Sequence, residues 1–309
     1  RVYENNGSSW IQLGQDIDGE AMSDESGRSI SLSSDGGIVA IGASNNDGNG
    51  NNPGSFGHVR IYSFNGSSWV QRGQDIDGEA ASDNSGHSVS LSGDGNTVAI
   101  GAHNNDGNGN VSGHVRVFEY INGNWFQKGQ DLDGEAAGDH SGHSVSLSGD
   151  GNTVAIAAHR NNGNGTNSGH VRIYFFNGSF WIQIGQDIDG EAAGDESGYS
   201  VSLSSDAGIV AIGAVNNDGN GLNSGHVRVY ENNAGNWVQL GNDIDGEASG
   251  DWSGHSVSLN GNGNTVAVAA PYNNGNGTYS GHVRIYENMG GSWYQIGNDI
   301  DGIYNTVSG

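Results

Sequence analysis

The chain has 309 residues, of which 56 are glycine, two are proline and none is cysteine. It carries 35 acidic against 10 basic residues, a formal net charge of −25. This acidity excludes nucleic acid or an anionic membrane surface as a partner, because both require basic patches. No disulfide can form, and no apolar run approaches the roughly 20 residues of a membrane-spanning helix, so we expect no membrane insertion.

One pattern recurs along the whole chain. A tryptophan precedes each copy of an acidic loop that begins D-x-D-G, and successive tryptophans are 59 residues apart once and 56 apart four times. The extra residues of the first period fall near 51–56. So strict a period predicts one domain, 1–309, without a linker. Its parts are an N-terminal hairpin with the first acidic loop (1–27), the repeats 28–83, 84–139, 140–195, 196–251 and 252–301, and a tail (302–309).

Each period predicts four short strands. In the period that starts at Ser85, apolar residues alternate with small ones in four segments that Gly-, Asn- and Asp-rich turns separate. The segments are 88–92, 97–102, 114–120 and 125–129. Val89 and Leu91 point to one face and Ser88 and Ser90 to the other, so a bulky face can pack on the small face of the next sheet.

Four antiparallel strands in about 56 residues predict one blade of a β-propeller. We therefore expect an all-β propeller with five full blades and, at the N-terminus, an outer hairpin that belongs to a partial sixth blade. Residues 303–307 of the tail would supply one more inner strand. The pattern leaves open whether the ring has five positions or six.

The repeat also resembles a known family. Residues 85–102, S-G-H-S-V-S-L-S-G-D-G-N-T-V-A-I-G-A, followed by S-G-H-V-R-V-F at 112–118, resemble the FG-GAP repeat. The resemblance covers nearly the whole chain and implies the propeller of integrin α subunits and of many bacterial surface proteins. The chain departs from the family in having Ser-Gly for Phe-Gly. The integrin-type calcium loop is replaced here by a short turn at 93–96, so the family's metal site does not carry over.

The acidic loops hold a candidate metal site of their own. Their acids occupy relative positions 1, 3, 5 and 9, a rhythm found in oxygen-rich calcium loops. The candidate calcium ligands are Asp16, Asp18, Glu20, Asp24, Asp75, Asp77, Glu79, Asp83, Asp131, Asp133, Glu135, Asp139, Asp187, Asp189, Glu191, Asp195, Asp243, Asp245, Glu247 and Asp251. The alternative is that these acids accept hydrogen bonds from turn amides and pair with a repeated arginine. That arginine is Arg1, Arg60, Arg116, Arg172, Arg228 or Arg284 in successive periods. We expect no other cofactor.

Other repeated residues suggest binding rather than catalysis. His114 recurs once per period, and identical histidines on every blade cannot form the asymmetric acid, base and nucleophile set of an enzyme. The N-N-D-G-N-G loops lose their Asp at Asn162 and Asn274, which favours surface loops over metal sites. The repeated tryptophans either pack the outer strands or form a sugar-stacking surface. Candidate glycosylation sites in N-x-S/T sequons are Asn6, Asn65, Asn110, Asn164, Asn177 and Asn276.

These observations favour a non-enzymatic protein outside the cell or on its surface, an adhesion module or the subunit of a self-assembling fibre. Self-association is expected through the N-terminal hairpin or the C-terminal tail, because unpaired strand edges recruit partners. A glycan or another protein is compatible as a ligand. The alternative is a lectin that binds carbohydrate at one site per blade.

Overall fold

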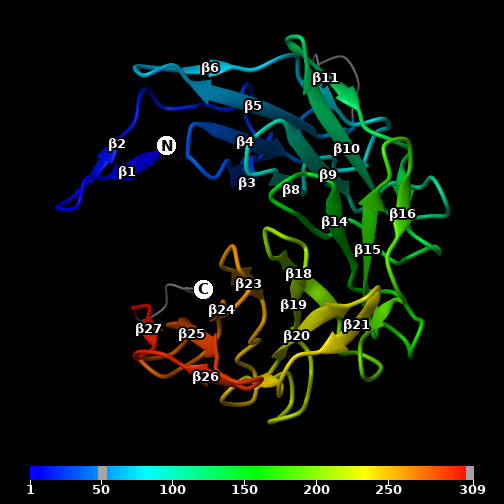
Figure 1. Cartoon of the computed structure of the whole chain (residues 1–309), viewed down its shortest axis with the longest axis vertical. Coiled ribbons are helices and arrows are strands. Elements are labelled where there is room, and N and C mark those ends of the chain that lie inside the picture. Colours follow the sequence, from blue (N-terminus) through cyan, green and yellow to red (C-terminus); the bar gives the residue numbers. More distant parts are fainter. Residues whose placement is uncertain (48–53, 304–309) are drawn as a thin grey trace.

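A computed structural model describes residues 1–47 and 54–303, and within those ranges every regular element is a β-strand. The strands form one two-stranded hairpin and five five-stranded sheets. In Figure 1 the sheets stand around a central opening as the blades of a propeller. The all-β propeller predicted above is confirmed. None of the described segments forms a helix long and apolar enough to cross a membrane.

The hairpin consists of β1 (Tyr3–Asn5) and β2 (Trp10–Gln12), and we number the five sheets as blades 1 to 5 in chain order. Blade 1 comprises β3 (Ser26–Leu32), β4 (Ile38–Ala43), β5 (His58–Phe64), β6 (Trp69–Gln71) and β7 (Ile76–Asp77). Blade 2 comprises β8 (Ser88–Leu91), β9 (Thr97–Ala102), β10 (His114–Ile121), β11 (Asn124–Gln127) and β12 (Leu132–Asp133). Blade 3 comprises β13 (Ser144–Leu147), β14 (Thr153–Ala158), β15 (His170–Phe176), β16 (Trp181–Gln183) and β17 (Ile188–Asp189). Blade 4 comprises β18 (Ser197–Leu203), β19 (Ile209–Ala214), β20 (His226–Asn233), β21 (Asn236–Gln239) and β22 (Ile244–Asp245). Blade 5 comprises β23 (Ser256–Leu259), β24 (Thr265–Ala270), β25 (His282–Asn288), β26 (Trp293–Gln295) and β27 (Ile300–Asp301).

Each blade has one strand more than the four that the sequence pattern predicts. The fifth is only two residues long and comes from the start of the acidic loop: in blade 1, Ile76 lies opposite Val59 and Asp77 opposite His58 in an antiparallel pairing with β5. A two-residue strand is too short to show alternation. Its apolar residue anchors it, because Ile76 is 4% exposed and belongs to the core between blades.

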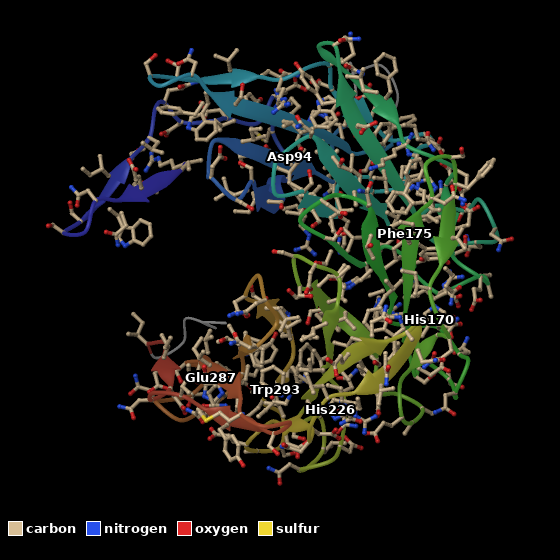
Figure 2. All side chains as sticks on the ribbon, in the orientation of Figure 1. Asp94, His170, Phe175, His226, Glu287 and Trp293 are labelled. Carbon is tan, nitrogen blue, oxygen red and sulfur yellow. The ribbon has the colours of Figure 1, made fainter. Side chains whose placement is uncertain are left out.

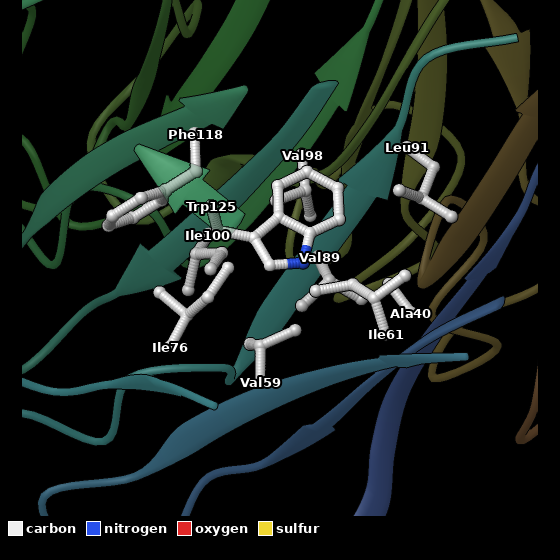
Figure 3. Packing of buried hydrophobic residues seen from close by; sticks show 10 residues of the cluster. All are labelled: Ala40, Val59, Ile61, Ile76, Val89, Leu91, Val98, Ile100, Phe118 and Trp125. Atoms are coloured by element: carbon white, nitrogen blue, oxygen red, sulfur yellow. The ribbon is translucent and has the colours of Figure 1, made fainter. Parts of the chain in front are cut away.

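The bulky face of one blade packs on the small face of the blade before it, as the alternation predicts. Figure 3 shows this contact between blades 1 and 2. Blade 2 contributes Val89, Leu91, Val98, Ile100, Phe118 and Trp125, and blade 1 contributes Ala40, Val59, Ile61 and Ile76. Three further clusters of the same kind follow, of which one joins blades 3 and 4 and another blades 4 and 5. The core is therefore divided into layers between blades.

The serines that alternate with the bulky residues join the innermost strands of neighbouring blades. The amide of Leu91 donates to Ser31 Oγ of the preceding blade at 2.9 Å, and the amide of Leu147 donates to Ser90 Oγ at 2.9 Å. The same bond links blade 3 to blade 4 and blade 4 to blade 5. The inner strands thus gain hydrogen bonds beyond their own sheet.

Two predictions fall partly or wholly outside the described residues. The insertion placed at 51–56 overlaps residues 48–53, which the structure does not describe. The strand predicted at 303–307 lies outside the described residues except for Ile303.

Candidate functional site

The four acids of one acidic loop go to three different places. In the loop that follows blade 2, Asp131 accepts a hydrogen bond from Gln127 at 2.5 Å and lies near His114 of the same blade. Asp133 is the last residue of β12. Asp139 is 1% exposed and closes the turn by accepting from the amide of Ala136 at 3.0 Å. The remaining acid, Glu135, reaches the next blade.

Asp139 also holds the N-N-x-G-N-G loop of blade 3, because its Oδ2 accepts from Asn161 Nδ2 at 3.0 Å. The acids at this ninth position are buried in all five loops and make the equivalent bond. They are Asp24, Asp83, Asp139, Asp195 and Asp251. These carboxylates therefore cap turns, as the alternative to calcium binding predicts.

Glu135 meets groups of blade 3 instead of the other acids of its own loop. Its Oε1 lies 3.4 Å from Arg172 Nη1, and its Oε2 lies 3.9 Å from His170 Nδ1. His170 Nδ1 also lies 3.7 Å from Asp187 Oδ2, which belongs to the following acidic loop. A glutamate, a histidine and an aspartate from two loops and one strand thus form one cluster, which we call the Glu-His-Asp cluster. Figure 2 shows His170 and His226 in neighbouring blades, outside the central opening.

The Glu-His-Asp cluster occurs five times, with its ligand atoms within 4.8 Å of one another. The clusters are Glu20, His58 and Asp75; Glu79, His114 and Asp131; Glu135, His170 and Asp187; Glu191, His226 and Asp243; and Glu247, His282 and Asp299. Burial, followed by the adjacent arginine, lowers the pKa of the histidine, to about 4 for His170. The imidazole is therefore neutral at neutral pH and offers a lone pair.

The observed clusters group the acids differently from the sequence prediction, in which the four acids of one loop would bind one calcium ion. Calcium prefers six to eight oxygen ligands, whereas each cluster supplies one nitrogen and two carboxylates beside a guanidinium. Each cluster also takes its acids from two loops, so the sequence rhythm at positions 1, 3, 5 and 9 does not describe one ligand set. Calcium binding by the acidic loops stays a prediction.

The repeated arginines are ion-pair partners of the acidic loops, as the sequence predicts, and three of them are buried. Arg116, Arg172 and Arg284 are 6–8% exposed, and each pairs with the glutamate of the preceding loop. Arg228 binds Glu191 and also makes two bonds of 3.0 Å to Asp243. Arg1 is the exception, because it pairs with Asp16 in an exposed position.

Five of the six repeated tryptophans pack against the preceding blade or hairpin and are unavailable for sugar stacking. Trp125 is 3% exposed and donates its indole N–H to the carbonyl of Arg72 at 2.7 Å. Its ring lies on Gly73, where an added Cβ would stand 2.7 Å from Trp125 Cδ1. Glycine is required because only it leaves room for the ring. We call this carbonyl and glycine the indole socket.

Five tryptophans fill such a socket. The pairs are Trp69 on Leu13 and Gly14, Trp125 on Arg72 and Gly73, Trp181 on Lys128 and Gly129, Trp237 on Ile184 and Gly185, and Trp293 on Leu240 and Gly241. The first pair matters most, because its socket belongs to the N-terminal hairpin. The hairpin β1–β2 therefore stands where a preceding blade would stand, and the ring has six positions.

The sixth position is only partly filled by the described residues. Ile30 and Leu32 on the bulky face of blade 1 are 67% and 48% exposed, whereas the equivalent Val89 and Leu91 are 8% and 7% exposed. A cavity of about 380 Å³ lies between this face and β1. Figure 1 shows the gap that separates the hairpin from blade 5. Within the part of the chain that the structure describes, this side of blade 1 is less covered than the equivalent side of blade 2.

The six predicted glycosylation sites are all exposed, but three of them donate a hydrogen bond from the side-chain amide nitrogen, and in Asn110 this bond goes to Asp106 Oδ1 at 3.5 Å. Asn164 Nδ2 donates to the carbonyl of Gly190 at 2.8 Å, and Asn276 Nδ2 donates to that of Gly302 at 2.9 Å. Asn6, Asn65 and Asn177 instead use Oδ1 as an acceptor in turns between outer strands. Glycan attachment is thus more compatible with these three.

A further polar group at one mouth of the central channel was missed by the sequence predictions. It contains the residues that differ most between otherwise similar repeats, at three positions. One position holds Arg28, His87, His143, Tyr199 and His255, which line a cavity of about 450 Å³. The second holds Ser44, His103, His159, Val215 and Pro271, and the third holds Glu25, Asn84, His140, Glu196 and Trp252.

The backbone at the third position is left-handed in every blade, with φ of 53–56°. Non-glycine residues rarely adopt this conformation, and such strain is often found at functional sites. The signal in the sequence was the breakdown of the repeat itself: scaffold positions stay constant, whereas these positions change. They supply the asymmetry that the repeated histidines lack.

Comparison with known proteins agrees with this architecture. The FG-GAP repeat family matches residues 76–118, 132–174 and 188–230. A search of curated proteins gave no match. Similar solved structures include hydrazine synthase of Kuenenia stuttgartiensis, with 14% identity, a TM-score of 0.54 and coverage of 93% of this chain and 69% of that chain. A second is a Bacteroides uniformis ATCC 8492 protein described as a 6-phosphogluconolactonase, with 13% identity, a TM-score of 0.54 and coverage of 90% and 86%. Identity this low shows the fold alone, and with the three matched repeats the conclusion is that the chain is a β-propeller that contains FG-GAP repeats.

Proposed function

We propose that this protein is a non-enzymatic structural or adhesion propeller, located outside the cell or on its surface, and that copies associate head to tail. The proposal rests on an exposed tryptophan at one end of the propeller and an unfilled indole socket at the other. We call a tryptophan that can fill such a socket a plug. Trp10, the sixth repeated tryptophan, is 69% exposed. Gly297, the sixth repeated socket glycine, has no heavy atom of residues 1–47 or 54–303 within 4 Å of the position of an added Cβ.

The other five plugs and sockets support the match. Gly297 has the same backbone conformation as the filled sockets, with φ of 75° against 65–81° for the other five. The carbonyl beside it, that of Ile296, holds the place from which Leu240 accepts the indole N–H of Trp293. In the described structure Trp10 is not seated on Gly297 of its own chain. A second copy is therefore the occupant that we propose.

The walls of the sixth position give such an association apolar area to bury. Ile30 and Leu32 are exposed on blade 1, and Ile300 on blade 5 is 59% exposed where the equivalent Ile244 is 3% exposed. Burial of apolar surface contributes about 25 cal/mol per Å². Because plug and socket are different surfaces, the contact is heterologous, and it gives rings or filaments according to whether the rotation closes.

The charge and the repeated clusters suit a structural or adhesion role. A charge of −25 keeps such a protein soluble, and the absence of cysteine is compatible with any redox compartment. The Glu-His-Asp clusters are equivalent on five blades, which suits repeated structural contacts better than a single reaction centre.

The experiment is a concentration series in analytical ultracentrifugation. We expect the mass of the wild-type protein to rise with concentration and the Trp10→Ala variant to remain a monomer. Phe180→Ala is the matched control, because Phe180 is 62% exposed on the outside of blade 3 and belongs to no socket. A wild-type protein that stays monomeric at the highest soluble concentration refutes the proposal, as does association that survives in Trp10→Ala.

The lectin alternative is supported at one place only. Trp252, Tyr272 and Tyr279 line a pocket of about 240 Å³, with Trp252 and Tyr272 edge to face at 4.9 Å between ring centroids. Aromatic faces of this kind can stack on sugars. The other blades lack these residues at the equivalent positions. A glycan array that shows binding by the wild type and loss in Trp252→Ala would favour a lectin with a single site.

A further inference from the structure

Five histidines crowd one mouth of the central channel. His87 and His103 come from blade 2, His143 and His159 come from blade 3, and His140 lies in the loop that leads into blade 3. No other pair of neighbouring blades has histidines at these positions together. The group is thus a departure from the repeat and not a consequence of it, and it does not depend on the self-association proposed above.

The ring centroids stand near the spacing expected for imidazoles on one metal ion, although among the described residues the ligand atoms that already lie within 4.8 Å of one another belong to the Glu-His-Asp clusters. The ring centroids of His103 and His140 are 5.7 Å apart, and those of His140 and His159 are 5.6 Å apart. A Zn–N bond is about 2.0–2.1 Å long, so the centroids of two imidazoles on one tetrahedral ion lie about 5 Å apart. His140 therefore stands between two partners that are within reach of a shared ion.

These three rings also have nitrogen atoms without a use in the protein. The Nδ1 atoms of His103, His140 and His159 are buried and have no hydrogen-bond partner among the described residues. His159 is 5% exposed as a whole residue. A buried polar atom without a partner costs about 1–3 kcal/mol, so three such atoms in one cluster require a reason.

The surrounding residues prepare a fourth ligand. His143 Nδ1 lies 3.1 Å from the carbonyl of Tyr199, to which it donates in the tautomer that this contact favours. Its Nε2 is then an acceptor. A backbone carbonyl that orients the second nitrogen is the usual arrangement behind a metal-bound histidine. His143 lies 4.1 Å from His159 between ring centroids, so it can complete the set.

We propose that His103, His140 and His159 bind one divalent transition-metal ion such as Zn²⁺, Ni²⁺ or Cu²⁺, with His143 as a fourth ligand. Binding rotates the imidazoles from their present stacked and tilted arrangement, so that the free nitrogens face one centre. The ion enters through the 450 Å³ cavity of the channel, which His87 and His143 line.

The chemistry of the donors selects this class of ion. Imidazole nitrogen suits zinc, copper and nickel, whereas calcium and magnesium prefer oxygen. Burial lowers the pKa of His143 to about 3 and that of His103 to about 2, so both rings are neutral and hold a free lone pair. Arg160 Nη1 donates to His140 Nε2 at 3.4 Å, which places the proton of the neutral ring on Nδ1. Coordination through His140 Nδ1 therefore requires this contact to break and the proton to leave Nδ1, and the charge of Arg160 opposes the ion. The net charge of −25 favours cations over anions at the mouth.

The test uses untagged protein and Cu²⁺, and it must separate this site from the five Glu-His-Asp clusters. A His-only site couples the copper electron to three or four nitrogens, whereas a Glu-His-Asp cluster has one. We expect the first equivalent of Cu²⁺ to give an electron paramagnetic resonance spectrum with at least three equivalent nitrogens. Zn²⁺ should compete for that equivalent.

Two variants complete the design. In His103→Gln with His159→Gln, the affinity for the first equivalent should fall at least 100-fold and the multi-nitrogen signal should disappear. His255→Gln, a channel histidine outside the triad, and His114→Gln, from a Glu-His-Asp cluster, should leave both unchanged. Melting curves show whether each variant is folded. A first equivalent with one nitrogen, a signal that survives in the double variant, or its loss in His114→Gln overturns the proposal.

Discussion

The ion pair between Glu135 and Arg172 should respond asymmetrically to the loss of either partner. The side chain of Arg172 is 10% exposed, whereas that of Glu135 is 46% exposed. Replacing Glu135 with glutamine leaves a buried guanidinium without its counter-charge. Replacing Arg172 with methionine leaves a carboxylate that water can reach. The glutamate variant should therefore be the less stable of the two.

The structure sets the size of each effect. Removing one partner of a buried pair costs about 3–5 kcal/mol, and we expect about 3 kcal/mol for Glu135→Gln. The lower end applies because Arg172 Nη2 keeps its hydrogen bond of 2.9 Å to the carbonyl of Asp133. For Arg172→Met we expect about 1–2 kcal/mol, which is the cost of leaving that carbonyl unpaired.

Thermal melting followed by circular dichroism measures the difference. At roughly 2 °C per kcal/mol for a chain of this size, Tm should fall by roughly 6 °C in Glu135→Gln and by roughly 3 °C in Arg172→Met. Arg1→Met is the control, because Arg1 occupies the repeat position of Arg172 but pairs with Asp16 of the following loop at 60% and 39% side-chain exposure. Its Tm should not change, since exposed ion pairs contribute little to stability. Equal losses in all three variants, or a larger loss in Arg172→Met, would refute the reasoning.

Three other outcomes are expected. Trp125→Ala should lower the free energy of unfolding by about 3–5 kcal/mol because it empties an indole socket. Trp10→Ala should leave the stability of the monomer unchanged, and a comparable loss of Tm in both variants would contradict the socket assignment. In metal-free protein, the free energy of unfolding should fall as pH drops from about 6.5 toward about 4. Burial, followed by Arg28 and His140, lowers the pKa of His87 to about 4 in the folded protein. The unfolded chain binds this proton already below about 6.5, so acid favours unfolding. A flat Tm between pH 7.5 and pH 5 would count against it, and His87→Gln should reduce the slope. Excess EGTA should not change Tm, because Asp139 and Glu135 already have protein partners; a clear drop would instead support calcium in the acidic loops.

The sequence predicted the architecture because every blade repeats the same physical instructions. Alternation at Val89 and Leu91 placed the strands, and the position of Arg172 in the period indicated an internal partner, which the structure identifies as Glu135. The fifth strand was missed because Ile76 and Asp77 are too few residues to show a period. The grouping of acids was missed because rhythm along one loop does not reveal that Glu135 reaches the following blade.

The mouth of the channel was missed for a different reason. His103 and His140 are 37 residues apart, and no local pattern relates them. Their proximity depends on how blade 3 docks on blade 2, which is a property of the folded ring. A repeat protein nevertheless offers one usable signal. Positions that change between repeats while their neighbours stay constant are not required for packing of the blades, and they indicate candidate functional residues.

A series of backbone hydrogen bonds between blades predicts where the propeller begins to unfold. At the turns of the inner strands, Ser34 donates to Gly93, Gly93 to Gly149, Gly149 to Ser205 and Ser205 to Gly261, each at 2.8–2.9 Å. A closed ring of such links has no terminal member, whereas this series has two. Repeat arrays lose stability from their ends, because an end unit has one neighbour and an inner unit has two. Local unfolding should therefore begin at the sixth position and proceed toward blade 3. Amide exchange should be fastest in the hairpin and blade 5 and slowest in blade 3. A partner bound in the gap would link the two ends and slow exchange in both.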